Sequence, residues 1–253
     1  MNTVTVNGFK MAYEKHGDGE SSLLLIHGNL ASKRWWNLVK EPLAECFTVF
    51  MVDLRGCGQS EKPPAGYSIW QYGDDVLAFI KRMGLERLSV VGHSMGGAIS
   101  MDIASKNPEL LEKLILLNPA PVFGFPTSQD KYQMIEQYSS DRELLQAALT
   151  AVVPMGAHTP LFQELVDDAW NSTHTAIPNA RSLGEIDYTK WAETFSKPVK
   201  LLYGEQDVLI SLDDMTRTIG YFPNGQLVTH PGVGHSPQVE DPEWFVRETL
   251  DFL

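Results

Sequence analysis

Cysteine is scarce in this sequence, which contains only Cys46 and Cys57. Two cysteines cannot form the multiple disulfides that stabilise small secreted domains. Neither residue has the close Cys/His spacing of a zinc site, so we expect no metal centre. The shortage of cysteine therefore favours a protein with reduced thiols, and the cytoplasm is its expected compartment.

Positive charge is scarce too: 20 lysines and arginines stand against 32 aspartates and glutamates, and the formal net charge is −12. No basic stripe is present that could neutralise the phosphates of a nucleic acid or dock on an anionic membrane. Long apolar runs are also missing, since none approaches the roughly 18 residues of a membrane span. The first residues, MNTVTV, lack the pattern of a secretory signal. We expect a small-molecule substrate and neither nucleic acid nor membrane as a partner, and the oligomeric state stays open.

What the sequence does contain is a regular alternation of short apolar runs and segments with helical spacing. The Asn7-Gly8 pair predicts a hairpin turn near the start of the chain. Later runs are continuously apolar, which is typical of strands buried on both faces of a parallel sheet. We therefore predict an α/β fold with a mostly parallel, eight-stranded sheet flanked by helices. The expected strands are 3–6, 9–13, 23–26, 48–52, 88–91, 114–117, 199–203 and 226–229.

The alternation stops after Pro119, and no strand pattern returns before Val199. We predict an α/β core in two parts, 1–119 and 197–253, with a helical cap inserted at 120–196. The cap segment has ten acidic and four basic side chains, hence a formal charge of −6, and many large apolar residues. We interpret it as a lid with acidic faces toward water and apolar faces over a pocket. Candidate substrate-binding residues are Trp36, Phe125 and Trp170.

The predicted strand 88–91 runs into Gly92-His-Ser94-Met-Gly96, and a segment with helical spacing follows. A turn this sharp needs glycine at both flanking positions, because a side chain there would collide with the strand or the helix. The serine at its tip is then exposed, beside the first amides of the new helix. Ser94 is the candidate nucleophile. The alternative is a tightly packed turn whose serine only caps the helix.

A serine hydroxyl needs a base, and the base needs an orienting acid. Such groups gather at the carboxyl ends of the strands of an α/β sheet. His235 lies in a glycine-flanked loop after the last strand and is the expected base. His230, at the end of that strand, is expected to be a structural residue, and a catalytic role for it is the alternative. For the acid, Asn118 carries no charge, whereas Asp207 follows strand 199–203 in a Gly-x-x-Asp turn. Asp207 is therefore the expected acid.

An oxyanion needs two backbone donors that are in place before the reaction. Met95, directly after the nucleophile, is expected to supply one amide, and Asn29, after strand 23–26, the other. His27 is expected to anchor that loop. We expect Asp53 and Arg55 to tie the glycine-rich loop 53–60 near the site.

Five motifs occur in the order that is typical of the α/β-hydrolase superfamily. The chain resembles its capped esterase, lactonase and carbon–carbon hydrolase branch over nearly its whole length. This resemblance implies attack by Ser94, an acyl-enzyme, and hydrolysis by water that His235 activates. Haloalkane dehalogenases and epoxide hydrolases differ, because they place aspartate where this chain has Ser94. The motifs are His27-Gly28, Asp53-Leu-Arg-Gly-Cys-Gly-Gln-Ser60, Gly92-His-Ser-Met-Gly-Gly97, Gly204-Glu-Gln-Asp207 and Gly234-His235.

The leading functional hypothesis is a serine hydrolase that cleaves an ester or thioester of a small, neutral, largely apolar substrate, with no metal or organic cofactor. A carbon–carbon bond hydrolase or lyase could use the same pocket. A third hypothesis is a ligand receptor that turns over slowly, because a fold alone does not determine function.

Overall fold

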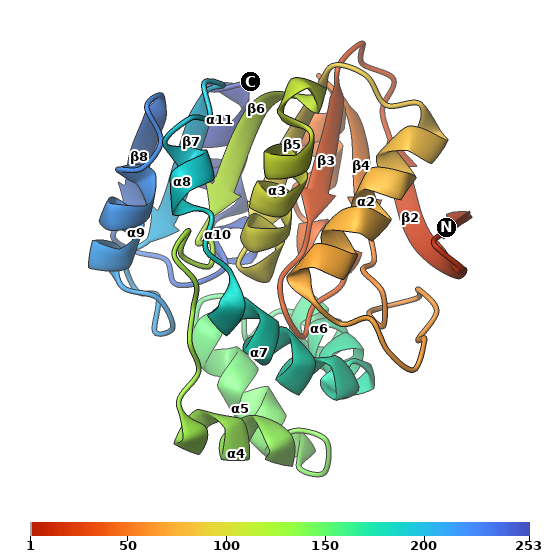
Figure 1. Cartoon of the computed structure of the whole chain (residues 1–253). Coiled ribbons are helices and arrows are strands. Elements are labelled where there is room, and N and C mark those ends of the chain that lie inside the picture. The colour runs from red at the N-terminus through yellow and green to blue at the C-terminus, as the bar shows by residue number, and fades with distance from the viewer. Residues whose placement is uncertain (1) are drawn as a thin grey trace.

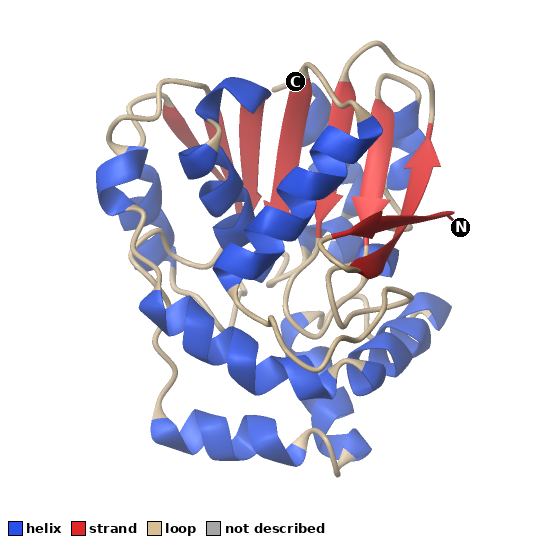
Figure 2. Ribbon diagram, turned by 45° about the vertical axis from the view of Figure 1, so that its right-hand side comes forward, coloured by secondary structure: helices blue, strands red, loops and turns tan. Residues whose placement is uncertain are grey.

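The computed structural model describes residues 2–253, and its centre is a single eight-stranded sheet with helices on both faces (Figures 1 and 2). The strand order is β1-β2-β4-β3-β5-β6-β7-β8, and every pair from β4 to β8 is parallel. Only the β1–β2 hairpin and the pairing of β2 with β4 are antiparallel. The prediction of a mostly parallel, eight-stranded sheet is therefore confirmed. The strands are β1 (Asn2–Val6), β2 (Phe9–His16), β3 (Ser22–Ile26), β4 (Thr48–Val52), β5 (Leu88–His93), β6 (Leu111–Leu117), β7 (Val199–Gly204) and β8 (Gly225–His230).

Successive side chains of the central strands enter opposite cores, as the period of a β-strand requires. In β3, Leu24 and Ile26 belong to the apolar cluster on one face, whereas Leu23 and Leu25 belong to the cluster on the other. Both faces of the sheet are therefore buried, which explains the continuously apolar strand sequences.

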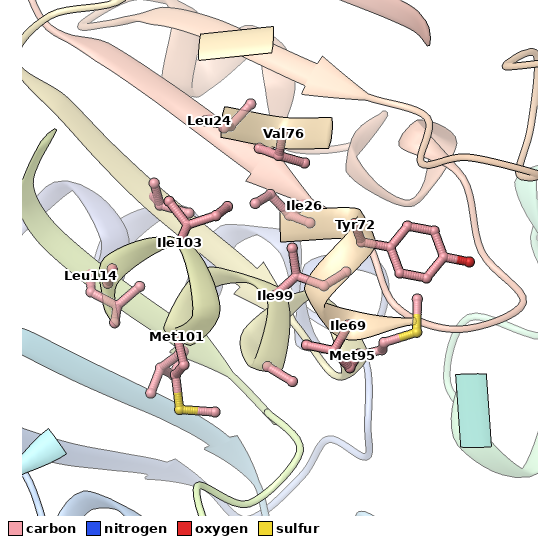
Figure 3. Packing of buried hydrophobic residues seen from close by; sticks show 14 of the residues in the cluster. Leu24, Ile26, Ile69, Tyr72, Val76, Met95, Ile99, Met101, Ile103 and Leu114 are labelled. Carbon is pink, nitrogen blue, oxygen red and sulfur yellow. The ribbon is translucent and has the colours of Figure 1, made fainter. Parts of the chain in front are cut away.

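Helices from distant parts of the chain cover the two faces of the sheet. On the first face, the apolar residues of α2 (Ile69–Met83) and α3 (Met95–Lys106) pack on the strands (Figure 3). This cluster also includes Met215 of α9 (Leu212–Ile219). The second face is covered by residues of η1, α1 and α11. The bounds of these and of the neighbouring short helices are η1 (Lys33–Trp36), α1 (Lys40–Ala44), η2 (Pro108–Leu110), α10 (Pro237–Glu240) and α11 (Pro242–Leu250).

Between β6 and β7 the described chain contains helices and no strand. Helices α4 to α7 lie together beyond the carboxyl ends of the parallel strands, at the lower edge of the sheet in Figure 1. Their apolar residues form a third cluster with Leu30 and Trp35 of the core. The segment consists of α4 (Gln129–Gln137), α5 (Arg142–Val152), α6 (Pro160–Asn171), η3 (Thr173–Thr175), α7 (Ala176–Glu185) and α8 (Thr189–Ala192).

Helix α8 is placed differently from the other helices of the predicted cap. The hydroxyl of Tyr188 donates to Oδ1 of Asp102 in α3, 2.9 Å away. Trp191 packs on Phe195 and Phe222, which belong to the core of the first face. The end of the segment 120–196 therefore lies against the α/β core, and only α4 to α7, the cap, lie beyond the ends of the strands. Among residues 2–253, no helix is both long and apolar enough to cross a membrane.

Candidate active site

Ser94 lies at the tip of the turn between β5 and α3, with φ 55° and ψ −118°. A non-glycine residue with positive φ is strained, and such strain persists only where the surrounding structure enforces it. Here the Ser94 amide donates to the carbonyl of Leu117 at 3.0 Å. Side chains at the flanking glycines would also collide with backbone: a Cβ at Gly92 would meet the carbonyl of Gly96, and a Cβ at Gly96 that of Ile26. The predicted reason for both glycines therefore holds.

His235 and Asp207 come together at the same edge of the sheet. The two atoms His235 Nδ1 and Asp207 Oδ2 are 2.7 Å apart, and both side chains are buried. Because a carboxylate only accepts, Nδ1 carries the proton and Nε2 of the neutral ring is left as a base. Ser94 and His235 line one cavity. The three predicted residues thus meet at one site.

The carboxylate of Asp207 is fixed by several donors. Asn118 Nδ2 donates to Oδ2 at 2.8 Å, and the amides of Leu209 and Ile210 donate to Oδ1 at 2.8 and 3.2 Å. Burial acts to raise the pKa of Asp207, but the nearby His235 and these hydrogen bonds outweigh it, so that the pKa lies below its ordinary value. The acid therefore stays ionised and can stabilise an imidazolium.

The loop that carries His235 is held from two sides. Glu240 accepts hydrogen bonds from the amides of Gly234 at 3.2 Å and Ser236 at 3.0 Å, the two neighbours of His235. The ring of His93 donates from Nε2 to the carbonyl of His235 at 2.9 Å. Burial and then the charge of His235 lower the pKa of His93 to about 3. His93 is therefore a neutral support and not a second base.

Two backbone amides are placed to receive an oxyanion. Strands β3 and β5 are neighbours, so the turn after β3 passes close to the nucleophile: a Cβ on Gly28 would be 2.9 Å from that of Ser94. The amides of Asn29 and Met95 follow Gly28 and Ser94, and neither donates to an acceptor within residues 2–253. Both N–H groups are free for a substrate oxygen, as the oxyanion-hole prediction requires.

A cavity of about 230 Å³ lies over Ser94, between the strand ends and the cap. Its lining is mostly apolar. Lys131, on α4, is the only lysine, arginine or carboxylate that lines it among the residues that the structure describes. The apolar lining from the cap includes Ile135, Tyr138, Leu145, Leu149, Val152 and Leu183.

The structure places the three predicted substrate-binding residues differently. Phe125 lines the cavity. Trp36 does not: its ring is fully buried against Phe245, with 6.0 Å between the ring centroids, and Trp35 lines the cavity in its place. The reason is local, because η1 is a 3₁₀ helix in which consecutive side chains point about 120° apart. Trp170 packs at the edge of the cap cluster and also lies outside the lining.

The charged residues of the loop 53–60 form ion pairs that hold this loop in place next to the site. Asp53 pairs with Lys33 at 2.7 Å and accepts from the amide of Gln59, which ties the loop down as predicted. Arg55 pairs with Asp75 and not with Asp53. In the neighbouring turn, His27 Nε2 accepts from the amide of Leu54 at 3.0 Å, so this ring anchors the loop after β3.

Sequence reasoning missed three supporting residues. It weighed Asn118 only as a possible acid, whereas the side chain holds the acid in place. Glu240 and Asn179 received no role, although Asn179 Nδ2 donates to Asn29 Oδ1 at 2.8 Å. The position of Asn118 directly after β6 is a signal that could have found it, because catalytic groups gather at strand ends.

Within residues 2–253, no group of three or more histidine, cysteine or acidic side chains could hold a metal ion.

Known proteins share the fold of this chain. A putative esterase/lipase of Haemophilus influenzae is 25% identical over 251 residues, covering 91% of this chain and 82% of that protein. An uncharacterized protein of Mycobacterium tuberculosis is 28% identical over 272 residues, covering 98% of this chain and 80% of that protein. The solved structure of the esterase EaEST from Exiguobacterium antarcticum superposes with a TM-score of 0.90 at 21% identity, covering 99% of this chain and 98% of that one. The family model of the alpha/beta hydrolase fold matches residues 22–242, and the chain therefore belongs to that family.

Proposed function

We propose that this protein is a serine carboxylesterase that works through an acyl-enzyme on Ser94. The observation that carries the proposal is the buried 2.7 Å bond between His235 and Asp207, in a cavity that Ser94 also lines. A buried carboxylate that fixes the imidazole with Nε2 as the free base is the arrangement that activates a serine.

In the proposed reaction, Ser94 Oγ attacks the ester carbonyl while His235 Nε2 takes the hydroxyl proton. The carbonyl oxygen becomes an oxyanion and accepts from the amides of Asn29 and Met95. When this intermediate collapses, His235 returns the proton to the leaving oxygen and an alcohol departs. A water molecule, deprotonated by the same nitrogen, then attacks the acyl-enzyme, and the carboxylic acid and free Ser94 are released.

The cavity supports a small, neutral and largely apolar substrate. Its lining is apolar, and the carboxylates of the cap lie elsewhere, for example in the exposed pairing of Asp167 with Arg142. With a formal charge of −6 on the segment 120–196, the field outside the cavity is negative and opposes the entry of polyanions such as coenzyme A thioesters.

The test is a series of neutral 4-nitrophenyl esters of increasing acyl length, beside the matching coenzyme A thioesters at low and moderate salt. We expect hydrolysis of the esters, with kcat/KM highest for short to medium chains and low for the thioesters. A preference for the thioester that persists at low salt would contradict the proposed substrate class. If Ser94 reacts with a serine-directed phosphonate but no ester is hydrolysed, a lyase or receptor function is supported instead.

A further inference from the structure

Asn29 offers more than its backbone amide, because its side chain is locked in one orientation. Its Oδ1 accepts two hydrogen bonds, from the amide of Leu30 at 3.0 Å and from Asn179 Nδ2 at 2.8 Å. Rotating the carboxamide by 180° would set its NH₂ group against both of these donors. The orientation is therefore fixed by chemistry, and Nδ2 points away from Leu30 and Asn179.

The donor Asn179 is itself locked. It comes from α7 of the cap and is fully buried, as is Tyr72 of α2. The hydroxyl of Tyr72 donates to Asn179 Oδ1 at 2.9 Å, so Asn179 can present only its NH₂ group to Asn29. Figure 3 shows the hydroxyl of Tyr72 directed away from the apolar residues around its ring. Donation thus runs in one direction, from Tyr72 through Asn179 to Asn29, and each bond polarises the next.

The end of this chain of hydrogen bonds faces the cavity. Asn29 lines the cavity and is only partly buried. Its Nδ2 has no acceptor within residues 2–253, and it is not among the buried side-chain atoms that lack a partner. An oriented pair of N–H donors is therefore available in a cavity whose walls are otherwise mostly apolar.

The sheet order indicates which part of a substrate these donors meet. Asn29 follows β3, on one side of β5, whereas His235 follows β8, beyond β6 and β7 on the other side. In the proposed reaction His235 protonates the leaving group, so the leaving group lies on the side of β8. The part of the substrate next to Asn29 is then the acyl group.

We propose that the carboxamide of Asn29 is a specificity-determining group that donates from Nδ2 to an oxygen of the acyl group beside the scissile carbonyl, and that Asn179 is the positioning residue that aims it. The inference rests on the proposed esterase function and narrows its substrate class. The preferred acyl groups are apolar but carry an ether, hydroxyl or ring oxygen one or two atoms from the ester carbonyl. A purely hydrocarbon acyl group leaves the aimed N–H groups without an acceptor, which a site built to donate a hydrogen bond disfavours.

The test compares two esters of equal size, 4-nitrophenyl methoxyacetate and 4-nitrophenyl butyrate, which differ by an oxygen in place of one methylene. The quantity measured is the ratio of their kcat/KM values, divided by the ratio of their rates of hydrolysis by hydroxide to remove the difference in intrinsic reactivity. The wild-type protein is compared with Asn29→Ala, which keeps the backbone amide. It is also compared with the double variant Tyr72→Phe/Asn179→Leu, which removes both buried polar groups together and so leaves neither unpaired.

We expect the corrected ratio to favour methoxyacetate in the wild type and to fall about 3- to 10-fold in both variants, the size of one net hydrogen bond. Asn171→Leu, a matched change of an exposed asparagine on α6 of the cap, should leave the ratio unchanged. An unchanged ratio in a folded Asn29→Ala protein would overturn the proposal, and so would an equal loss for both esters, which would show that the side chain only positions the oxyanion-binding amide. A fall in Asn29→Ala without one in the double variant would remove the role of Asn179. Failure of the wild type to cleave either ester would instead refute the esterase function, and this inference with it.

Discussion

Replacing Asp207 by asparagine should disable the site while leaving the fold nearly unchanged. Oδ2 of Asp207 accepts from His235 and Asn118, and Oδ1 accepts from the amides of Leu209 and Ile210. In Asp207→Asn, the NH₂ group therefore faces two donors in either orientation. The clash between the new NH₂ group and the N–H group of His235 is relieved when His235 takes the other tautomer, in which Nδ1 accepts and Nε2 is protonated. In that form the ring cannot take a proton from Ser94.

The loss of kcat that we expect from this geometry has two causes: His235 takes the wrong tautomer, and no negative charge lies beside the imidazolium. Losing the correct tautomer through this substitution lowers kcat by roughly 10⁴-fold in the serine protease that serves as the general template. We expect a loss of about 10³- to 10⁴-fold here, which corresponds to about 4 to 5.5 kcal/mol of transition-state stabilisation. The change in the free energy of unfolding should be much smaller than this loss, because the substitution leaves the hydrophobic core intact.

The assay is kcat/KM for 4-nitrophenyl butyrate, with Tm as the measure of folding. Asp214→Asn is the matched control, because Asp214 is a half-buried residue in the first turn of α9 that bonds to Ser211 and does not line the cavity. The control should retain activity within about twofold, as expected for a position outside the site. Comparable losses in Asp207→Asn and Asp214→Asn would refute the assignment of the acid.

Three further changes test the supports of the site. Asn118→Gly, which suits the positive φ of 39° at this position, should lower kcat about 10- to 100-fold, because it removes a hydrogen bond to a charged group. Gly28→Ala should lower kcat by about 10²-fold or more, since the new Cβ would be 2.9 Å from Cβ of Ser94 and would displace the reacting groups. Burial raises the pKa of Glu240 above its ordinary 4.5, so the folded state holds this proton more tightly than the unfolded chain, and stability should decline as the pH rises from 4.5 through the raised value. Glu240→Gln should flatten that decline in a series of Tm measurements against pH, and a decline of unchanged slope would contradict this role.

The parts of the site that could be predicted from the sequence are those that local constraints determine. The turn at Ser94 is defined by its own flanking glycines and by the strand and helix on either side. Asp207 and His235 were found because each follows a predicted strand, and the carboxyl ends of parallel strands meet at one edge. For the same reason the order of apolar runs was enough to predict the sheet.

The parts that could not be predicted depend on contacts between distant residues or on small local rotations. The partners of Asn179 and Asn118 are 150 and 89 residues away along the chain. The sequence around Asn179 indicates no role at the site, and the position of Asn118 after β6 places it at the site without indicating that it holds Asp207. Trp35 and Trp36 are adjacent and point in different directions, and which of them reaches the cavity depends on distant contacts such as that of Trp36 with Phe245. Helix α8 lies against the core through contacts of Tyr188 with Asp102 and of Trp191 with Phe222, and periodicity does not reveal either contact.

The central claim is that Ser94 becomes acylated during turnover. The measurement is intact and peptide mass spectrometry of the wild-type protein and of Ser94→Ala, each quenched in acid during hydrolysis of 4-nitrophenyl butyrate. We predict one butyryl group on the wild-type peptide that contains Ser94, no such group in Ser94→Ala, and a loss of turnover of several orders of magnitude in that variant. A folded Ser94→Ala protein that still hydrolyses the ester at near wild-type rate, or an acyl group found on another residue, would contradict the account.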